Sequence, residues 1–381
     1  MKIYKKINVF DEALNRIRYL FEEFENVVVA FSGGKDSTVV LNLALKVAEE
    51  KNRLPLKVMF LDQEAEWQSV IDYMHEVMED ERVEPMWFQI PFKIFNATSN
   101  VKQWITAWGD GEEHMREFVP YSFKENKYGT DRFYKLFDAI VNTEFKGIRT
   151  ALLGGVRSEE SPRRHVAMTQ DATYKWITWG KQLDKKQDHY TFYPIYDWSY
   201  TDVWKSIHDN KWKYTKVYDF QYMNGVPLRD MRVSNLHHET AIQVLFYLQD
   251  VEAETWNKLV KRMSGINTAG KLNKKDFFIT ELPFMFKNWA EYRDYLTEKI
   301  VVNEEHKTIF KKKWIEFDER FKELATLDQL IKVQINSILA NDYEFTKLKN
   351  FTEKPEMEAW KRFQKDGIET QWTIKNKNIK R

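Results

Sequence analysis

The chain has 381 residues, more than one typical domain, so we expect one large domain with an appendage or two domains. Lys and Arg number 59 and Asp and Glu number 58, so the overall charge gives no argument for a nucleic-acid partner or an acidic substrate. Cysteine is absent, which excludes disulfides, thiolate metal sites, iron–sulfur clusters and cysteine nucleophiles in this chain.

The first predicted elements are a helix, a buried strand and a second helix. Phe10–Phe24 has apolar residues on one face, and Asp11 is placed to cap it. Val27–Phe31 is a β-branched apolar run typical of a parallel strand. A helix over Thr38–Glu50 follows. The residues between strand and helix therefore lie beside the positive end of a helix dipole, where anions bind.

The segment between them reads Ser32, Gly33, Gly34, Lys35, Asp36 and Ser37. Its glycines can take positive φ and bring backbone N–H groups close to a ligand, while the serines add hydroxyl donors and the lysine a charge. These groups suit a phosphate or pyrophosphate. The segment is not a Walker loop, because position 29 is Val and position 36 is Asp. The alternative interpretation is an ordinary Gly-Gly turn.

Two carboxylates follow the second buried strand, Leu56–Leu61. With a helix between the two strands this is a βαβ unit, and ligands of such sheets bind at the carboxyl ends of the strands. Asp62 and Glu64 stand at that end, so they can accept hydrogen bonds from a ribose or adenine, or hold Mg²⁺. The alternative is a pair of solvated turn carboxylates.

Other stretches carry less chemistry. A helix is expected around Val70–Met78 and a third strand over Glu84–Pro91. The aromatic stretch Asn96–Lys127 is a lid, a partner surface or, more simply, core packing. Phe192–Tyr222 is assigned to packing, with Thr201 as the predicted N-cap of its helix.

A second group of polar residues follows the short apolar strand Ala151–Leu153. Gly154 and Gly155 end that strand where the Ser32–Ser37 segment should also lie. After them come guanidinium forks suited to phosphate or sulfate oxygens, a hydroxyl and two carboxylates. These residues are Arg157, Arg163 and Arg164, Ser161, and Glu159 and Glu160. The alternative is a solvated charged loop.

The two motifs resemble those of a known superfamily. SGGKDS after an apolar strand resembles the PP-loop of the ATP pyrophosphatase superfamily. G-x-R-x-x-E-S-x-x-R, from Gly155 to Arg164, resembles the second signature of its phosphoadenosine phosphosulfate (PAPS) reductase branch. The resemblance spans Asn8 to Ile266, and it implies that the loop holds the pyrophosphate of ATP or the phosphates of a related adenylyl nucleotide.

The resemblance also implies roles for single residues. The implied nucleotide-binding residues are Ser32, Gly33, Gly34, Lys35, Asp36, Ser37, Asp62, Glu64, Gly155, Arg157, Glu160, Ser161, Arg163 and Arg164. Lys35, Arg157 and Arg164 are the predicted catalytic residues, and Asp36 and Asp62 the predicted ligands of Mg²⁺.

One departure from the family bears on the chemistry. PAPS reductases use a cysteine near the C-terminus, and this chain has none, so reduction by this chain alone is not expected. The chain is more similar to phage and enterobacterial PAPS-reductase-like proteins of the prophage co-activator type, which are commonly paired with a ParB-like partner. Met231–Ser234 and Trp256–Ile266 resemble their extension. The neighbouring His237, His238 and Glu239 are not expected to bind a metal, because adjacent helical residues point apart.

The predicted fold is α/β: a doubly wound, mainly parallel sheet of the adenine nucleotide alpha hydrolase-like type, with a C-terminal helical region. We expect a nucleotide-binding domain over residues 1–235 and a helical accessory region over 236–381. The latter has periodic runs and a basic end that can contact nucleic acid, although a solvated surface is the simpler interpretation. Those runs are Trp289–Val301, Lys307–Leu324, Leu327–Leu339 and Pro355–Phe363, and the end carries Lys375, Lys377, Lys380 and Arg381.

The predicted function is adenylylation of an acceptor from ATP and Mg²⁺, with release of pyrophosphate. Two alternatives stay open: a PAPS-binding enzyme that uses the thiol of another protein, and a non-catalytic nucleotide sensor that controls a ParB-like, DNA-associated partner. The N-terminus is too polar for a signal peptide, and no apolar run approaches the about 20 residues that a membrane span needs. We therefore expect a cytoplasmic protein with no membrane partner.

Overall fold

A computed structural model describes residues 6–99, 104–184, 187–238, 241–266, 281–321 and 327–339, and residues 342, 343, 345 and 348. The chain forms two compact units. The first comprises the described parts of Met1–Ile94, Trp104–Leu236 and Tyr247–Arg262. The second comprises those of Phe95–Gln103, His237–Phe246 and Met263–Arg381.

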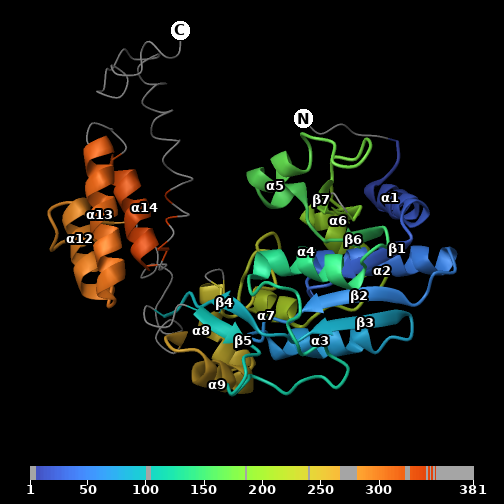
Figure 1. Ribbon diagram of the computed structural model, residues 1–381, viewed down its shortest axis with the longest axis horizontal. Helices are drawn as coiled ribbons and strands as arrows, with labels where there is room; N and C mark the ends of the chain where they lie inside the picture. The colour runs from blue at the N-terminus through green and yellow to red at the C-terminus, as the bar shows by residue number, and fades with distance from the viewer. Residues whose placement is uncertain are drawn as a thin grey trace, which may run out of the picture. The chain divides into compact units, whose positions relative to one another are not determined.

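The first unit is built on a six-stranded sheet in the order β3-β2-β1-β6-β8-β7 (Figure 1). Its neighbouring strands are parallel except that β7 runs antiparallel to β8. The strands are β1 Asn26–Ala30, β2 Leu56–Leu61, β3 Val83–Phe88, β6 Thr150–Leu153, β7 Gly180–Asp184 and β8 His189–Phe192. Strands β4 Phe92–Phe95 and β5 Trp104–Ala107 form a separate pair.

Helices surround the strands, and shorter ones follow in the connections (Figure 1). They are α1 Val9–Glu23, α2 Lys35–Glu50, α3 Gln68–Met78, α4 Phe133–Glu144, the 3₁₀ turn η1 Ser158–Glu160, α5 Pro162–Ala167, α6 Tyr200–Asp209, α7 Val217–Met223, α8 Ile242–Val251 and α9 Ala253–Arg262.

Alternate residues of the central strands enter two different cores. Val27 and Val29 pack into one core with apolar residues of α1, α2, α3 and α6. Val28 packs into the other, together with Met59 of β2 and residues of α4. Both faces of the sheet are therefore covered by helices, which explains why its strands read as continuous apolar runs. This confirms the predicted doubly wound, mainly parallel α/β fold.

Two predicted helix caps are wrong by two or three residues. Helix α1 is capped by Asn8, whose side-chain oxygen accepts the backbone N–H of Asp11 at 2.9 Å, so Asp11 lies in the first turn. Helix α6 is capped by Ser199, which exchanges hydrogen bonds with Asp202 in a capping box, and Thr201 lies inside the helix. In each case another residue that can cap a helix stands just upstream of the predicted cap.

The second unit contains a helical region with its own apolar core. Its helices are α12 Trp289–Ile300, α13 Glu304–Phe321 and α14 Leu327–Leu339, which confirms the predicted C-terminal helices in that range. Arg293 is buried among them and bonds both Asp318 and Gln334. The predicted run Pro355–Phe363, the basic end and Glu239 lie outside the described residues. No helix in the described ranges is both long and apolar enough to cross a membrane.

Candidate functional site

The loop after β1 is held in shape by its own side chains. Gly33 has φ of +72°, which favours glycine, and a Cβ there would lie 2.9 Å from a methyl group of Val70 in α3. The Ser37 hydroxyl donates to the carbonyl of Gly34 at 2.9 Å and lies 3.1 Å from the Ser32 hydroxyl. The loop is therefore tight and preformed at the start of α2.

Helix α2 begins at Lys35, three residues earlier than predicted. Gly34 is its N-cap and makes no side-chain capping bond, and Asp36 lies in the first turn. Lys35, Asp36 and Ser37 are thus helical residues at the positive end of the dipole. The N–H groups of a first turn have no partner within the helix, so this end can receive an anion.

The second motif meets the first at Gly155. A Cβ placed on Gly155 would lie 2.6 Å from the backbone nitrogen of Ser37 and 2.7 Å from the carbonyl carbon of Asp36. No side chain fits at that distance, so only glycine allows the segment after β6 to touch the first turn of α2. The two motifs, 118 or more residues apart, form one site, as the strand-end argument predicts.

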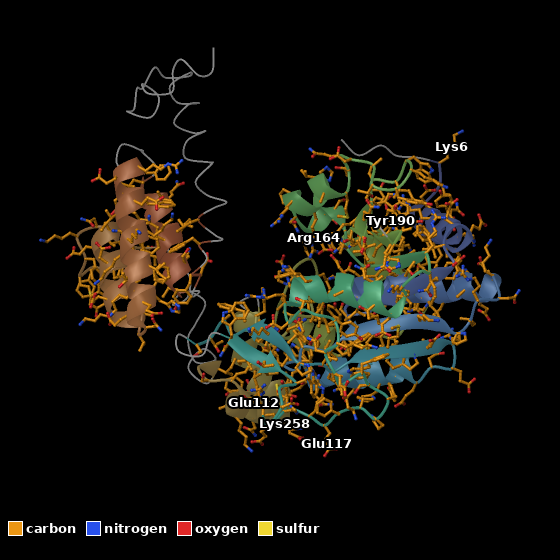
Figure 2. All side chains as sticks on the ribbon, viewed as in Figure 1. Lys6, Glu112, Glu117, Arg164, Tyr190 and Lys258 are labelled. Atoms are coloured by element: carbon orange, nitrogen blue, oxygen red, sulfur yellow. The ribbon has the colours of Figure 1, made fainter. Side chains whose placement is uncertain are left out.

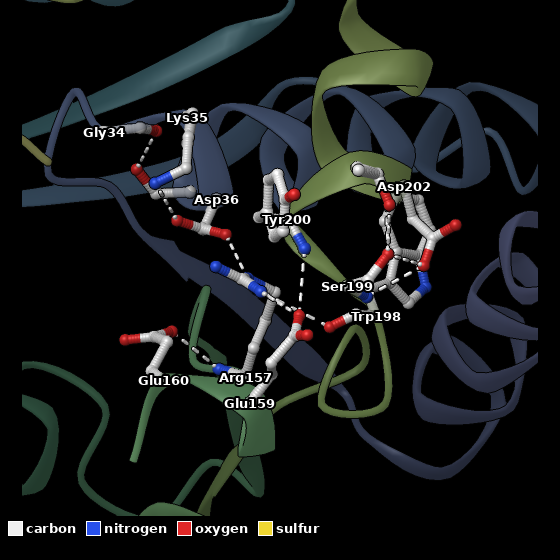
Figure 3. A network of polar contacts seen from close by, with 12 residues as sticks. Gly34, Lys35, Asp36, Arg157, Glu159, Glu160, Trp198, Ser199, Tyr200 and Asp202 are labelled. Atoms are coloured by element: carbon white, nitrogen blue, oxygen red, sulfur yellow. Dashed lines mark hydrogen bonds and ion pairs between the residues drawn. The ribbon is translucent and has the colours of Figure 1, made fainter. Parts of the chain in front are cut away.

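One carboxylate joins the two motifs, as Figure 3 shows. Asp36 accepts from Arg157 Nε at 2.5 Å, and its other oxygen lies 3.3 Å from Lys35 Nζ. Both cationic side chains are 4% exposed. Burial lowers the pKa of Lys35, and the charge of Asp36 opposes that shift. Asp36 thus bridges the two cations at the loop, and Glu159 lies 3.4 Å from Arg157 as a second anion.

Glu160, Ser161 and Arg164 organise the segment after Arg157. Glu160 accepts the backbone N–H of Arg157 at 2.9 Å and pairs with the guanidinium of Arg164. Ser161 is the N-cap of α5 and accepts the N–H of Arg164 at 3.2 Å. Arg164, labelled in Figure 2, is half exposed; burial lowers its pKa, and the charge of Asp36 acts in the opposite sense. Arg164 therefore lies within electrostatic reach of the loop.

Arg163 is not drawn into this group. Its side chain is exposed and makes no ion pair with any described residue. Its predicted nucleotide contact stays a prediction.

Asp62 lies at the predicted strand end but is occupied by protein donors. One oxygen accepts the backbone N–H of Glu64 at 2.9 Å and pairs with Arg116. The other accepts from Trp87 Nε1 at 2.9 Å and from Gln89 Nε2 at 3.3 Å. The side chain is completely buried. Its predicted contacts with a nucleotide or with Mg²⁺ gain no support from this geometry.

Glu64 is satisfied in the same way. Arg262 of α9 forms a fork with it, with nitrogen–oxygen distances of 2.6 and 3.1 Å. The backbone N–H groups of Trp108 and Met115 supply two more donors, at 2.9 and 3.2 Å. The solvated-turn alternative is wrong for both carboxylates, because both are buried, yet their partners are protein groups rather than a ligand.

Sequence reasoning missed three residues of the loop site. The Tyr218 hydroxyl accepts the backbone N–H of Lys35 at 2.7 Å, the carbonyl of Met231 accepts from Lys35 Nζ at 2.9 Å, and Arg232 acts on the same lysine through its charge. Tyr218 was assigned to packing. A carbonyl acceptor has no sequence signal, since every residue carries one.

The site fits phosphate groups better than a metal ion. A preformed loop at a helix start and buried cations suit phosphate oxygens. Asp36, by contrast, is already paired with two cations. Among the residues that the structure describes, no group of three or more His, Asp or Glu side chains is placed to hold a metal. The predicted Mg²⁺ ligation by Asp36 and Asp62 stays a prediction.

Two family models match the chain. Residues 26–224, more than half of the chain, match the model described as phosphoadenosine phosphosulfate reductase domain. Residues 225–371 match a domain of unknown function, DUF3440. The first match contains both motifs of the site, and the second begins after Tyr218 and before Met231.

The individual proteins that are similar to this chain have low sequence identity to it. The chain is 26% identical over 287 residues to the YbdN protein of Escherichia coli strain K12, covering 71% of this chain and 70% of the relative. It is 27% identical over 240 residues to sulfate adenylyltransferase subunit 2 of Mycolicibacterium vanbaalenii, covering 59% and 68%. A solved PAPS reductase of Candida auris shows 13% identity and a TM-score of 0.32, covering 62% of this chain and 98% of that one. A structural likeness this low carries no argument.

Proposed function

Because the chain belongs to the phosphoadenosine phosphosulfate reductase domain family, we propose that it binds an adenine nucleotide where the β1–α2 loop meets the segment after β6. The observation that carries this proposal is the backbone approach of Gly155 to the first turn of α2. That approach places the buried cations Lys35 and Arg157 on the same carboxylate, beside the helix N–H groups. Phosphates are the part of a nucleotide that such groups recognise.

The reaction that these residues suit best is transfer of the adenylyl group of ATP to an acceptor oxygen. The acceptor would attack the α-phosphorus, the bond to the bridging oxygen would break, and pyrophosphate would leave with the bonding electrons. Lys35 and the loop N–H groups would stabilise the charge on pyrophosphate, and Arg157 and Arg164 that on the transferred group. A relative named sulfate adenylyltransferase subunit 2 supports this reaction class. We assign no step to Mg²⁺.

A second candidate reaction rests on the family name and on the lack of cysteine. Here the ligand is PAPS, and the thiolate of another protein attacks its sulfur. A sulfur–sulfur bond forms, the bond between the sulfur and the bridging phosphate oxygen breaks, and adenosine 3′,5′-bisphosphate leaves with the bonding electrons. The same loop and arginines would hold the nucleotide phosphates.

Turnover separates these proposals. The full chain is incubated with ATP, with and without inorganic sulfate as a trial acceptor oxyanion, and with PAPS plus a reduced dithiol protein. Pyrophosphate release that Lys35→Ala abolishes supports adenylyl transfer, whereas thiol-dependent release of adenosine 3′,5′-bisphosphate supports the second reaction. Stoichiometric binding without any product contradicts both and favours the nucleotide sensor.

Four expectations about the domain boundaries, partners and location of the protein stay predictions. They are the division into parts 1–235 and 236–381, a ParB-like partner, direct contact with nucleic acid, and a cytoplasmic location. We keep them as part of the proposal, to be tested after the nucleotide.

A further inference from the structure

A segment far along the chain is fixed against the phosphate loop. The Met231 carbonyl accepts from Lys35 Nζ at 2.9 Å, and the Tyr218 hydroxyl contacts the backbone of both Lys35 and Val233. The side chain of Gln221 in α7 clamps the next residue, donating to the Arg232 carbonyl at 2.7 Å and accepting its N–H at 3.0 Å. The backbone of 231–233 is thus held at the loop on both sides.

The side chain of Arg232 is exposed and, among the described residues, makes no ion pair. Its charge nevertheless reaches the site from this fixed backbone. Burial is the main cause that lowers the pKa of Lys35, and the charges of Arg157 and then Arg232 act in the same direction. Burial is also the main cause that lowers the pKa of Arg164, and the charge of Arg232 adds to it. Arg232 therefore lies near two cations that belong to different motifs.

The neighbouring anions are already used by other cations. Asp36 pairs with Lys35 and Arg157, Glu160 pairs with Arg164, and Glu159 lies 3.4 Å from Arg157. Figure 3 shows the contacts of Arg157 with Asp36 and Glu159. Arg232 is the cation of this group that has no carboxylate partner in the described part of the chain. Lys35 and Arg164 add further positive charge near it, so an added anion is the partner that the arrangement lacks.

We propose that Arg232 is a ligand-binding and specificity-determining residue, which contacts a tetrahedral oxyanion, phosphate or sulfate, of the nucleotide bound at the loop. This inference rests on the proposed function, since it assigns a partner within the same site. It also gives a role to the region matched as a domain of unknown function: that region, which starts at residue 225, supplies the arginine that completes a site built by the first domain.

The chain offers a matched control for Arg232. Arg229 lies three residues earlier, is also exposed, and makes no ion pair with a described residue. Its charge is not among those that act on Lys35 or Arg164. Arg229→Gln therefore removes the same charge from the same surface without touching the site.

The test is calorimetric titration of the full chain, as wild type, Arg232→Gln, Arg232→Lys and Arg229→Gln. The probes are AMP, ADP, ATP, adenosine 3′,5′-bisphosphate and inorganic pyrophosphate. We expect Arg232→Gln to weaken binding of at least one probe roughly tenfold to a hundredfold, with partial recovery in Arg232→Lys and no change in Arg229→Gln. A loss for ADP and ATP but not AMP places the oxyanion on the 5′ chain. A loss for the 3′,5′-bisphosphate but not AMP places it on the ribose.

Failure of this inference differs from failure of the proposed function. If the wild type binds nucleotides and Arg232→Gln binds all of them equally well, the role of Arg232 is overturned and the nucleotide site stands. If only pyrophosphate binds, and Arg232 is required, the oxyanion site stands and the nucleotide proposal falls. If no probe binds, both are overturned. The melting temperatures of the unliganded variants should match that of the wild type, which separates a binding role from a structural one.

Discussion

The carboxyl ends of β1 and β2 carry the same kinds of residue and are built for different purposes. After β1, the cations outnumber the carboxylates by one at a helix start. The cations are Lys35, Arg157, Arg164 and Arg232, and the carboxylates are Asp36, Glu159 and Glu160. After β2, Asp62 and Glu64 are matched by Arg116 and Arg262 and by further N–H donors, so little unpaired charge remains. The unpaired positive charge after β1 favours binding of an anion there, whereas the paired charges after β2 do not. Charge balance, rather than residue type, separates a ligand site from a structural network.

Breaking the network after β2 should give the largest effect. Arg262→Ala leaves the carboxylate of Glu64, which is 1% exposed, without its fork, and we expect the free energy of unfolding to fall by about 3–5 kcal/mol. Urea unfolding followed by circular dichroism measures this. Lys258→Ala, on the same helix but in an exposed pair with Glu254, should cost under about 1 kcal/mol. Equal small losses in both variants would contradict the structural role of the network.

The pH dependence of stability tests the buried carboxylates that follow β2 in a second way, through Glu66. Burial, reinforced by the charge of Asp62, raises the pKa of Glu66 from 4.5 to about 8. The unfolded chain therefore releases this proton at lower pH than the folded protein does, and stability is lost as the pH rises from about 4.5 to about 8. Glu66→Gln should remove this dependence and be more stable than the wild type at pH 8 by about 4 kcal/mol.

The control for Glu66 is Glu254→Gln, a fully exposed carboxylate of α9. Thermal unfolding of the wild type and both variants is measured from about pH 4 to about pH 9. This range covers the pKa of Glu66 in the unfolded chain, 4.5, and in the folded protein, about 8. A Glu66→Gln profile parallel to that of the wild type would contradict the effect of burial.

At the end of β1 the corresponding change should affect binding more than stability. Lys35→Met keeps the buried stem and removes the charge, so Arg157 still pairs with Asp36. We expect nucleotide binding to weaken roughly tenfold to a hundredfold, while the free energy of unfolding changes by under about 1 kcal/mol. Calorimetry and urea unfolding on the same samples test this. A large loss of stability with unchanged affinity would reverse the roles of the two strand ends.

The smallest expected effect lies outside both strand ends. Ser199→Ala removes the capping box of α6 and should cost about 1 kcal/mol, whereas Thr201→Ala, inside the helix, should cost much less. Thermal unfolding of the two variants distinguishes them. A larger loss of stability in Thr201→Ala than in Ser199→Ala would instead support Thr201 as the N-cap, as the sequence predicts.

The parts of the fold that depend on local patterns were predictable. Strands β1 and β2 follow from their continuous apolar runs, and the Gly-rich loop follows from the residues that its backbone needs. Caps were misplaced because several adjacent residues can accept the same N–H group. The meeting of the two motifs was expected from strand-end logic, and the steric fit at Gly155 gives it a physical reason.

Long-range pairing was not predictable. Nothing near Asp62 or Glu64 in the sequence indicates that Arg116 and Arg262 neutralise them, since an arginine far along the chain has many possible partners. The acceptor for Lys35 is a carbonyl 196 residues away, and any residue at position 231 would supply one. Such contacts are set by the tertiary fold, so the sequence alone could not separate ligand-binding from structural carboxylates.

The most direct test of the central claim adds one carbon atom at Gly155. Calorimetric titration with ATP compares the wild type, Gly155→Ala and Gly154→Ala. A Cβ at Gly154 would lie 3.1 Å from the ring of Tyr193 and 4.0 Å from a methyl group of Thr191, and it would meet no backbone atom of α2. We predict that Gly155→Ala still folds, as circular dichroism would show, but binds ATP roughly a hundredfold more weakly or worse, because the added carbon displaces the first turn of α2. Gly154→Ala should still bind ATP. Equal ATP affinity in all three proteins would contradict the claim that the nucleotide binds where the two motifs meet.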